Sequence, residues 1–204
     1  MGNKTEAPVI VEDNQQNTEV GSVLLTDGTY KIDISSSVIS WEGERITGAK
    51  EQGTVMLETG EVAVTEGQIA NGKFVINMET ITSEPFVERL VNHLKSDDFF
   101  KVDSFKTAEF NLKGINPTSE EGAKMGRYVI AGDLTIKGIT KPISFTATVN
   151  SVENSINAKA SFAINRADWE IKYQSPTFFQ NLGDKVIRDA ITIGLDLKAD
   201  KVIQ

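Results

Sequence analysis

The sequence predicts an all-β fold, an extended antiparallel β-barrel of about eight strands that is crossed by one short helix. Apolar and polar residues alternate with a period of two in many short segments between residues 30 and 197, and turn-forming residues separate several of them. A single long apolar stripe has helical spacing. Evenly spaced antiparallel strands with one helix are typical of a closed barrel, whose interior holds packed side chains or one small ligand.

The chain begins with a segment that has neither period. Residues 12–19 (EDNQQNTE) are polar throughout, so we expect residues 1–28 to form a disordered polar tail, or a tether, before a folded domain at residues 29–204. The first residues lack the apolar region of a signal peptide, and the sequence has no run of about 18 apolar residues that would form a transmembrane helix.

The first strands are expected from Thr29 onward. Their alternating apolar residues are Tyr30, Ile32, Ile34, Ile39, Trp41, Val55, Leu57, Val62, Val64, Phe74, Ile76 and Met78. Turn signals at Thr59-Gly60 and near Glu66-Gly67 separate some of these segments. Asn71-Gly72 predicts a β-hairpin, because this dipeptide accepts the positive φ that both central residues of such a turn require.

The helix is expected at residues 84–94. Pro85 would take its first position, where a missing backbone N–H costs nothing. The apolar stripe of this helix consists of Phe86, Leu90, Val91 and Leu94. A shorter turn is expected at residues 175–181.

Five later segments alternate more cleanly than the first ones. Each places apolar residues on one face and polar or small residues on the other, as antiparallel strands with one solvated face do. The apolar residues are Phe110 and Leu112; Tyr128, Ile130, Leu134 and Ile136; Ile143, Phe145, Ala147 and Val149; Ala158, Ala160, Phe162 and Ile164; and Ile191, Ile193, Leu195 and Leu197. These segments complete the predicted barrel.

Composition argues against several classes of function. The formal net charge is −8, the pI is about 4.8 and no basic patch is visible, so nucleic acid and anionic membranes are poor partners. Cysteine is absent, which excludes disulfides and thiolate chemistry. His93 is the one histidine, whereas a histidine-based zinc site needs two. Common nucleophile, phosphate-loop and calcium-loop motifs are also missing, so we expect no metal, no cofactor and no enzyme.

Aromatic residues concentrate near the end of the chain. Trp169, Tyr173, Phe178 and Phe179 lie within eleven residues, although aromatics make up 7% of the sequence. Such a turn either caps the protein's own core or closes the mouth of an apolar ligand cavity. The adjacent pair Phe99-Phe100 has the same two interpretations, as a plug of the barrel or as a ligand contact.

A few polar residues near these aromatics have structural and functional interpretations. His93, at the end of the predicted helix, either caps or packs there or contacts the head group of a ligand. Arg166 and Asp168 are expected to form a structural ion pair or a turn bond. The adjacent carboxylates of Asp97-Asp98 and Glu120-Glu121 are expected on a solvated surface.

Several short motifs follow one another in an order that resembles the YceI-like family. They are residues 93–100 (HLKSDDFF), 132–145 (GDLTIKGITKPISF), 165–169 (NRADW) and 182–187 (LGDKVI), preceded by residues 41–43 (WEG) and Gly48. Each motif is weak by itself, but the ordered set is specific and spans about residues 30–199.

The resemblance implies a lipocalin-like barrel with a long apolar tunnel. It implies that the chain binds an isoprenoid-type or other long-chain lipid, with a polyprenyl or quinone tail, for sequestration or transport. The ligand-binding candidates are Phe99, Phe100, Phe110, Phe145, Phe162, Trp169, Tyr173, Phe178 and Phe179. The alternative is a structural or protein-interaction barrel with a self-filled core and no ligand.

The resemblance also implies where such a protein works. Family members commonly carry export signals and some are lipoproteins, so we expect a periplasmic or other extracytoplasmic location. A lipoprotein form would have a membrane tether through the N-terminal tail. We expect a monomer or a homodimer.

Overall fold

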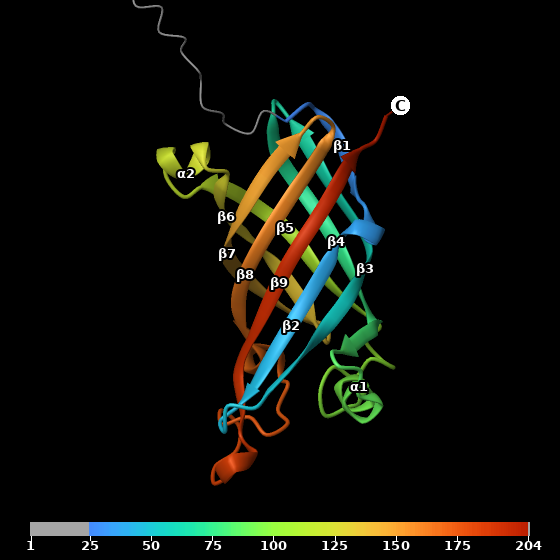
Figure 1. Ribbon diagram of the computed structural model, residues 1–204, viewed down its shortest axis with the longest axis vertical. Coiled ribbons are helices and arrows are strands. Elements are labelled where there is room, and N and C mark those ends of the chain that lie inside the picture. The colour runs from blue at the N-terminus through green and yellow to red at the C-terminus, as the bar shows by residue number, and fades with distance from the viewer. Residues whose placement is uncertain (1–24, 204) are drawn as a thin grey trace, which may run out of the picture.

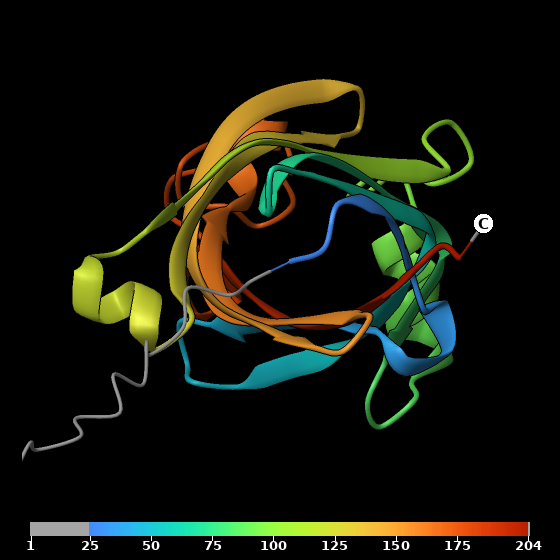
Figure 2. The same cartoon turned by 90° about the horizontal axis from the view of Figure 1, so that it is seen from above.

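The wall of the barrel is one antiparallel sheet that closes on itself, as the computed structural model of residues 25–203 shows (Figures 1 and 2). The predicted period-two segments form its strands, because alternation leaves each strand with one apolar face. The strands are β1 (Gly28–Ile32), β2 (Val38–Arg45), β3 (Lys50–Thr65), β4 (Gln68–Ser83), β5 (Thr107–Pro117), β6 (Arg127–Ile136), β7 (Ile139–Val152), β8 (Ser155–Asn165) and β9 (Ile187–Lys201). The predicted all-β antiparallel barrel is confirmed.

The nine strands occupy eight positions around the barrel. β1 and β2 share one position, since both pair with β3 on one side and with β9 on the other. For example, Tyr30 of β1 lies opposite Val62 of β3 and Lys201 of β9. The predicted number of about eight strands therefore matches the positions around the barrel, and the ninth strand is the second half of one of them.

A short 3₁₀ turn, η1 (Ile34–Ser36), separates β1 from β2. The Asp33 carboxylate caps this turn, because its Oδ1 accepts hydrogen bonds from the backbone N–H groups of Ser35 and Ser36 at 3.0 and 3.3 Å. The hydroxyls of the same two serines each donate to the carboxylate at 2.6 Å. The bonds from the Ser35 hydroxyl and then the Ser36 hydroxyl lower the pKa of Asp33 to about 2.

Two predicted turns are instead parts of long strands. β3 runs through Thr59-Gly60 and β4 runs through Asn71-Gly72, and the hairpin between them turns at Glu66-Gly67, whose φ angles are 54° and 71°. Gly60 and Gly72 lie under interior side chains: Ile32 covers Gly60, and Phe74 lies close to both glycines. These glycines make room for the side chains inside the barrel. In the sequence, a strand glycine with this role looks the same as a glycine that forms a turn.

The predicted helix is confirmed, but it begins later than expected. α1 spans Glu88–Lys95 and not residues 84–94. The Ser83 hydroxyl accepts a hydrogen bond from the Val87 N–H at 2.8 Å and donates to the Pro85 carbonyl at 3.0 Å. This closed turn occupies the residues that the sequence had placed in the first helical turn.

A second short helix, α2 (Glu120–Lys124), was not predicted. Its five residues carry no apolar stripe, and the Ser119 hydroxyl caps it by accepting a hydrogen bond from the Gly122 N–H at 2.9 Å. The turn expected at residues 175–181 is present, since the backbone N–H groups of Phe178 and Phe179 donate to the Ser175 carbonyl. Two further 3₁₀ turns are η2 (Arg166–Trp169) and η3 (Gly183–Lys185).

The apolar core forms two clusters that lie toward opposite ends of the barrel. The helix end, at the bottom of Figure 1, carries α1, η2 and η3, and its cluster includes Leu94, Phe99 and Trp169. The terminal end, at the top, is where β1 begins and β9 ends, and its cluster includes Tyr30 and Ile156. Each end of the barrel therefore has its own packed group of side chains.

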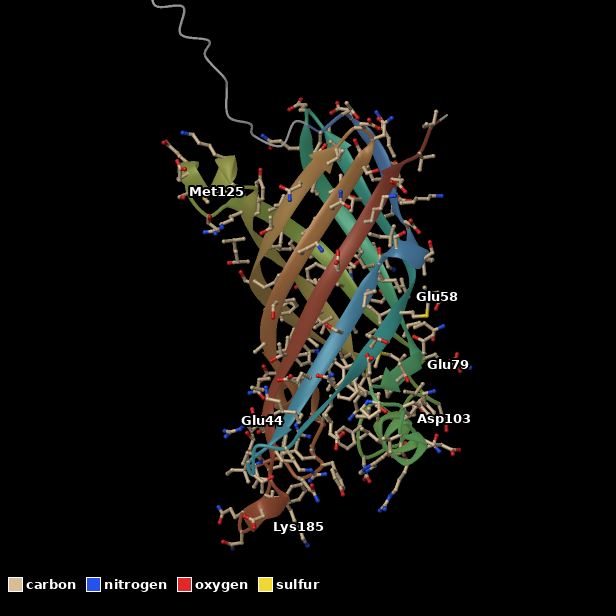
Figure 3. All side chains as sticks on the ribbon, viewed as in Figure 1. Glu44, Glu58, Glu79, Asp103, Met125 and Lys185 are labelled. Atoms are coloured by element: carbon tan, nitrogen blue, oxygen red, sulfur yellow. The ribbon has the colours of Figure 1, made fainter. Side chains whose placement is uncertain are left out.

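Charged side chains cover the outside of the barrel, where Glu58 and Glu79 point away from the wall (Figure 3). Most of the predicted N-terminal tail lies outside the described residues. Of its last residues, Leu25 is buried in the terminal-end cluster, and the Asp27 carboxylate accepts a hydrogen bond from the Gly67 N–H at 2.8 Å. Within residues 25–203, the helices are too short to span a membrane.

Replacing Gly132 by alanine is expected to destabilise the barrel. The new Cβ would collide with the Phe110 ring and would lie 2.6 Å from the backbone oxygen of Asn111. Overpacking of this kind costs about 1–3 kcal/mol, which urea unfolding would measure. The control is Gly114→Ala on β5, where the nearest atom to a new Cβ is the Asn116 Nδ2 at 3.9 Å. Equal losses in both variants would contradict the close packing at Gly132.

Asp33→Ala is expected to lower the melting temperature at neutral pH, because η1 loses its cap. The pKa of Asp33 is depressed in the folded protein, so its stabilising effect is complete above the ordinary value of 3.8 and is lost as the pH falls through about 2. Melting curves of the two proteins should therefore converge toward about pH 2. A difference in melting temperature that does not change with pH would show that the carboxylate charge is unimportant.

Candidate functional site

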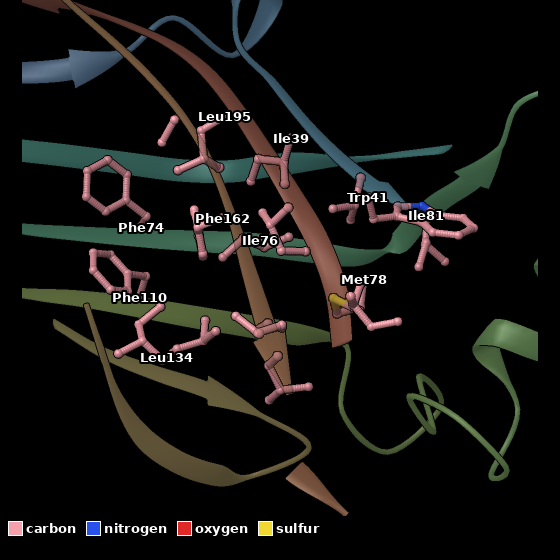
Figure 4. Close-up of a pocket in the computed structure, with 18 of the residues that line it drawn as sticks. Ile39, Trp41, Phe74, Ile76, Met78, Ile81, Phe110, Leu134, Phe162 and Leu195 are labelled. Carbon is pink, nitrogen blue, oxygen red and sulfur yellow. The ribbon is translucent and has the colours of Figure 1, made fainter. Parts of the chain in front are cut away.

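A cavity of about 630 Å³ occupies the interior of the barrel. Inward-facing side chains from all nine strands line it, and nearly all of them are apolar (Figure 4). One such side chain from each strand, in chain order, is Ile32, Ile39, Val55, Phe74, Phe110, Leu134, Phe145, Phe162 and Leu195. The volume is within the range of about 300–1,000 Å³ that is usual for small-molecule sites.

Several inward-facing aromatic side chains are half-buried, although they point away from bulk solvent. Phe110, Phe145 and Phe162 are of this kind, and all three line the cavity. The surface that they keep accessible therefore faces the cavity. The described side chains leave the barrel hollow, which is a correction to the alternative expectation of a self-filled core.

The cavity reaches the surface at the helix end. Val87, Arg89 and Glu51 line it and are exposed, and they come from the start of α1 and the beginning of β3. Arg45 also lines the cavity there, and its guanidinium donates a hydrogen bond to the Gln174 side chain at 3.3 Å. These residues define the mouth, which lies between α1 and the β2–β3 hairpin.

Four phenylalanines form an arc across the cavity wall, which we term the aromatic arc: Phe74 of β4, Phe110 of β5, Phe145 of β7 and Phe162 of β8. The distances between successive ring centroids are 6.2, 6.0 and 4.0 Å. The last pair, Phe145 and Phe162, is stacked with 8° between the ring planes. Between Phe110 and Phe145, β6 contributes Gly132, so the Phe110 ring lies over a strand position that has no side chain.

A second aromatic group lies near the mouth. The His93 ring packs edge-on against Phe99 and Tyr173, with centroid distances of 5.0 and 4.4 Å, and all three line the cavity. The His93 Nε2 is 3.1 Å from the Asp98 carboxylate. His93 thus packs near the end of α1, as one of its two interpretations expected. It also forms part of the cavity wall.

Arg166 holds the chain that connects β8 to β9. It is almost fully buried, and its guanidinium lies 3.3 Å from the Asp189 carboxylate. It also donates hydrogen bonds of 2.9–3.3 Å to the carbonyls of Ile171, Tyr173, Ile187 and Arg188. Burial lowers the pKa of Arg166, and the Asp189 charge opposes this shift. The predicted pairing with Asp168 is wrong, because Asp168 is exposed and Asp189 is the partner.

Seven of the nine predicted ligand-binding residues line the cavity: Phe99, Phe100, Phe110, Phe145, Phe162, Trp169 and Tyr173. Trp169 is 1% exposed, and its indole N–H donates to the Leu134 carbonyl at 3.2 Å. The structure places Phe178 and Phe179 outside the cavity, 39% and 48% exposed, because the turn after Ser175 directs them outward. The Lys172 ammonium lies 5.1 Å from the Phe178 ring centroid.

The candidates chosen from sequence left out most of the cavity wall. Phe74 and Trp41 line it, as do aliphatic residues of β2, β3 and β9 such as Ile39, Val55 and Leu195. The period-two pattern had placed these residues on the apolar face of their strands. It could not distinguish a packed interior from a hollow one, because both need the same inward-facing residues.

Comparison with known families agrees with the motifs in the sequence. Residues 30–199 match the model of the YceI-like domain. The chain belongs to the YceI-like family. A UPF0312 protein of Pseudomonas fluorescens (strain SBW25) is 27% identical over 173 residues, which cover 78% of this chain and 86% of that protein. A UPF0312 protein of Photorhabdus laumondii is 29% identical over 121 residues, which cover 58% and 59%.

Solved structures share the fold of this YceI-like protein at low sequence identity. A polyisoprenoid binding domain from Saccharophagus degradans, implicated in plant cell wall breakdown, has a TM-score of 0.66 at 14% identity and covers 85% of this chain and 98% of that one. BcnA of Burkholderia cenocepacia has a TM-score of 0.62 at 14% identity, with 82% and 98% covered. The YceI protein of Campylobacter jejuni has a TM-score of 0.54 at 20% identity, with 67% and 75% covered. The lipocalin-like barrel is therefore the fold of this chain.

The part of the chain that the structure describes has no group of three or more histidine or acidic side chains arranged to hold a metal ion. One of the charged residues that line the cavity lies close to a side chain of opposite charge. Glu44, which lines the cavity, is 3.5 Å from the Arg188 guanidinium. The chemistry of the cavity is therefore dominated by apolar contact.

Arg166→Met is expected to lower the free energy of unfolding by about 3–5 kcal/mol, because it removes the charged partner of the Asp189 carboxylate, which is 11% exposed and keeps only its hydrogen bonds from Thr177. Urea unfolding would measure the loss. The control is Arg188→Met, since the Arg188 side chain is 52% exposed and its contact with Glu44 is a surface pair worth about 0–1 kcal/mol. If both variants lose the same stability, Arg166 does not hold the β8–β9 connection as described.

Proposed function

We propose that this barrel binds one isoprenoid-type lipid, with a polyprenyl or quinone tail inside the cavity, for sequestration or transport. The observation that carries the proposal is an apolar cavity of about 630 Å³ that opens at the helix end. The polyisoprenoid binding domain of Saccharophagus degradans, which has the same fold, supports this choice of ligand.

The lining indicates how such a lipid would be held. Burying a methylene-sized group contributes about 0.8 kcal/mol, so one five-carbon isoprene unit contributes up to about 4 kcal/mol before costs. Ordering the tail and restricting its motion offset much of this gain. Because few polar side chains converge inside, affinity should depend mainly on the tail and only weakly on the head group.

The tail would enter first, through the mouth between α1 and the β2–β3 hairpin. At the opposite end, Tyr30 is 1% exposed and Val64 is 3% exposed, so packed side chains close the barrel there. A polar head group would then lie near Arg45 and Arg89, which line the mouth. Water is available at that end to solvate the head group, whereas the interior offers it little.

We propose a binding role and not a catalytic one. His93, the one imidazole, packs against Phe99 and Tyr173 and lies 3.1 Å from Asp98, which suits a structural side chain at the mouth.

We also propose an extracytoplasmic location, because the family resemblance implies export. Cell fractionation tests the location: recovery in the cytoplasmic fraction alone would contradict it.

Phe145→Asp is expected to reduce the binding of geranylgeraniol at least about tenfold, because a carboxylate in the cavity loses its hydration without gaining a partner. Displacement of a fluorescent apolar probe would measure the affinity. The control is Ser144→Asp, which places the same charge on the exposed face of β7. If Phe145→Asp remains folded by circular dichroism and binds with unchanged affinity, the cavity is not the binding site.

A further inference from the structure

The cavity continues beyond the aromatic arc toward the terminal end. Phe110 and Phe145 of the arc pack against the terminal-end cluster, whereas Phe74 contacts both clusters. Ala147, Val149 and Ile156 belong to the terminal-end cluster and also line the cavity. The arc therefore lies between a lower part of the cavity, which begins at the mouth, and an upper chamber behind the arc.

The cavity wall changes in bulk at the stacked pair of the arc. Phe145 and Ala147 are two residues apart on β7, and Phe162 and Ala160 are two residues apart on β8, so all four side chains face the interior. Ala147 and Ala160 lie directly opposite one another in the strand register. Immediately behind the stacked rings, the wall thus has two methyl groups in place of two rings, and both alanines line the cavity.

The arc is held in place by the wall behind it. Phe110 lies across β6 because Gly132 has no side chain, and Gly60 and Gly72 leave similar room beside Phe74. The rings of Phe110 and Phe145 consequently reach one another at 6.0 Å although β6 separates their strands. Because the wall fixes the aromatic arc, the boundary between the lower part of the cavity and the upper chamber has the same position for every ligand that enters.

The upper chamber is a dead end. Tyr30 of the terminal-end cluster is fully buried at this end and does not line the cavity, and its hydroxyl donates to the Thr26 carbonyl at 2.9 Å. Ile156 and Ala199 pack beside it, 5% and 3% exposed. A tail that passes the arc therefore has a limited depth available before it meets packed side chains.

We infer that the upper chamber is a separate subsite for the distal isoprene units of the lipid tail, and that the Phe145–Phe162 stack and Ala158 determine which tail lengths bind. Ala158 lines the chamber from β8, opposite Val149 of β7 and Leu197 of β9. This inference rests on the proposed function. It adds that affinity rises with tail length in two stages, first up to the arc and then into the chamber, and stops rising when the chamber is full.

The experiment measures the affinity of a series of all-trans prenols of increasing length, from geraniol through farnesol and geranylgeraniol to solanesol, for the full chain and its variants. Ala158→Leu fills the chamber and should move the plateau of affinity to a shorter tail. It excludes about two methylene-sized groups, so the longest prenol should bind about tenfold more weakly, while geraniol binds as before. The control is Ala163→Leu, which makes the same change on the exposed face of β8.

A second variant tests the role of the Phe145–Phe162 stack and remains useful if Ala158→Leu does not fold. Phe162→Leu removes one ring of the stack, so the plateau should move to a longer tail, opposite to the effect of Ala158→Leu. If the wild type binds prenols but neither variant moves the plateau, or if Ala158→Leu weakens short and long tails equally, the inference is overturned and the proposed function survives. If the wild type binds no prenol of any length, the proposed function fails and the inference fails with it.

Discussion

Closure of the sheet is the constraint on which the rest of this structure depends. Eight strand positions pair in a ring, and the long strands β3 and β9 each pair with both halves of the interrupted position that β1 and β2 share. A ring of about this size fixes an interior that side chains can just fill or that can hold one small ligand. Here side chains of both core clusters line a space inside the ring without filling it, so closure of the sheet leaves a cavity of about 630 Å³ that opens at the helix end.

The alternating pattern made the barrel predictable, whereas local turn signals were less dependable. The pattern reports which face of a strand is apolar, and a closed sheet uses that information at every strand. The turns predicted at Thr59-Gly60 and Asn71-Gly72 are wrong, because a dipeptide does not show which side chains will lie over its glycine in the folded protein. α2 escaped notice because a five-residue helix capped by Ser119 needs no apolar stripe.

The site was predictable in part for the same reason. Phe110, Phe145 and Phe162 were placed inside by strand alternation, and they line the cavity. Phe178 and Phe179 were chosen because aromatic residues cluster near them, but the turn at Ser175 directs both outward. The partner of Arg166 was missed because Asp189 lies far along the chain and is brought close only by the β8–β9 connection. Contacts between distant segments leave no periodic signal.

We propose that the hollow interior holds an isoprenoid-type lipid. Native mass spectrometry of gently purified protein, followed by organic extraction of whatever accompanies it, tests this most directly. We expect a discrete added mass that extracts as an isoprenoid, or one that appears after incubation with polyprenols or quinones. A mass that corresponds to the protein alone, before and after those incubations, would contradict it.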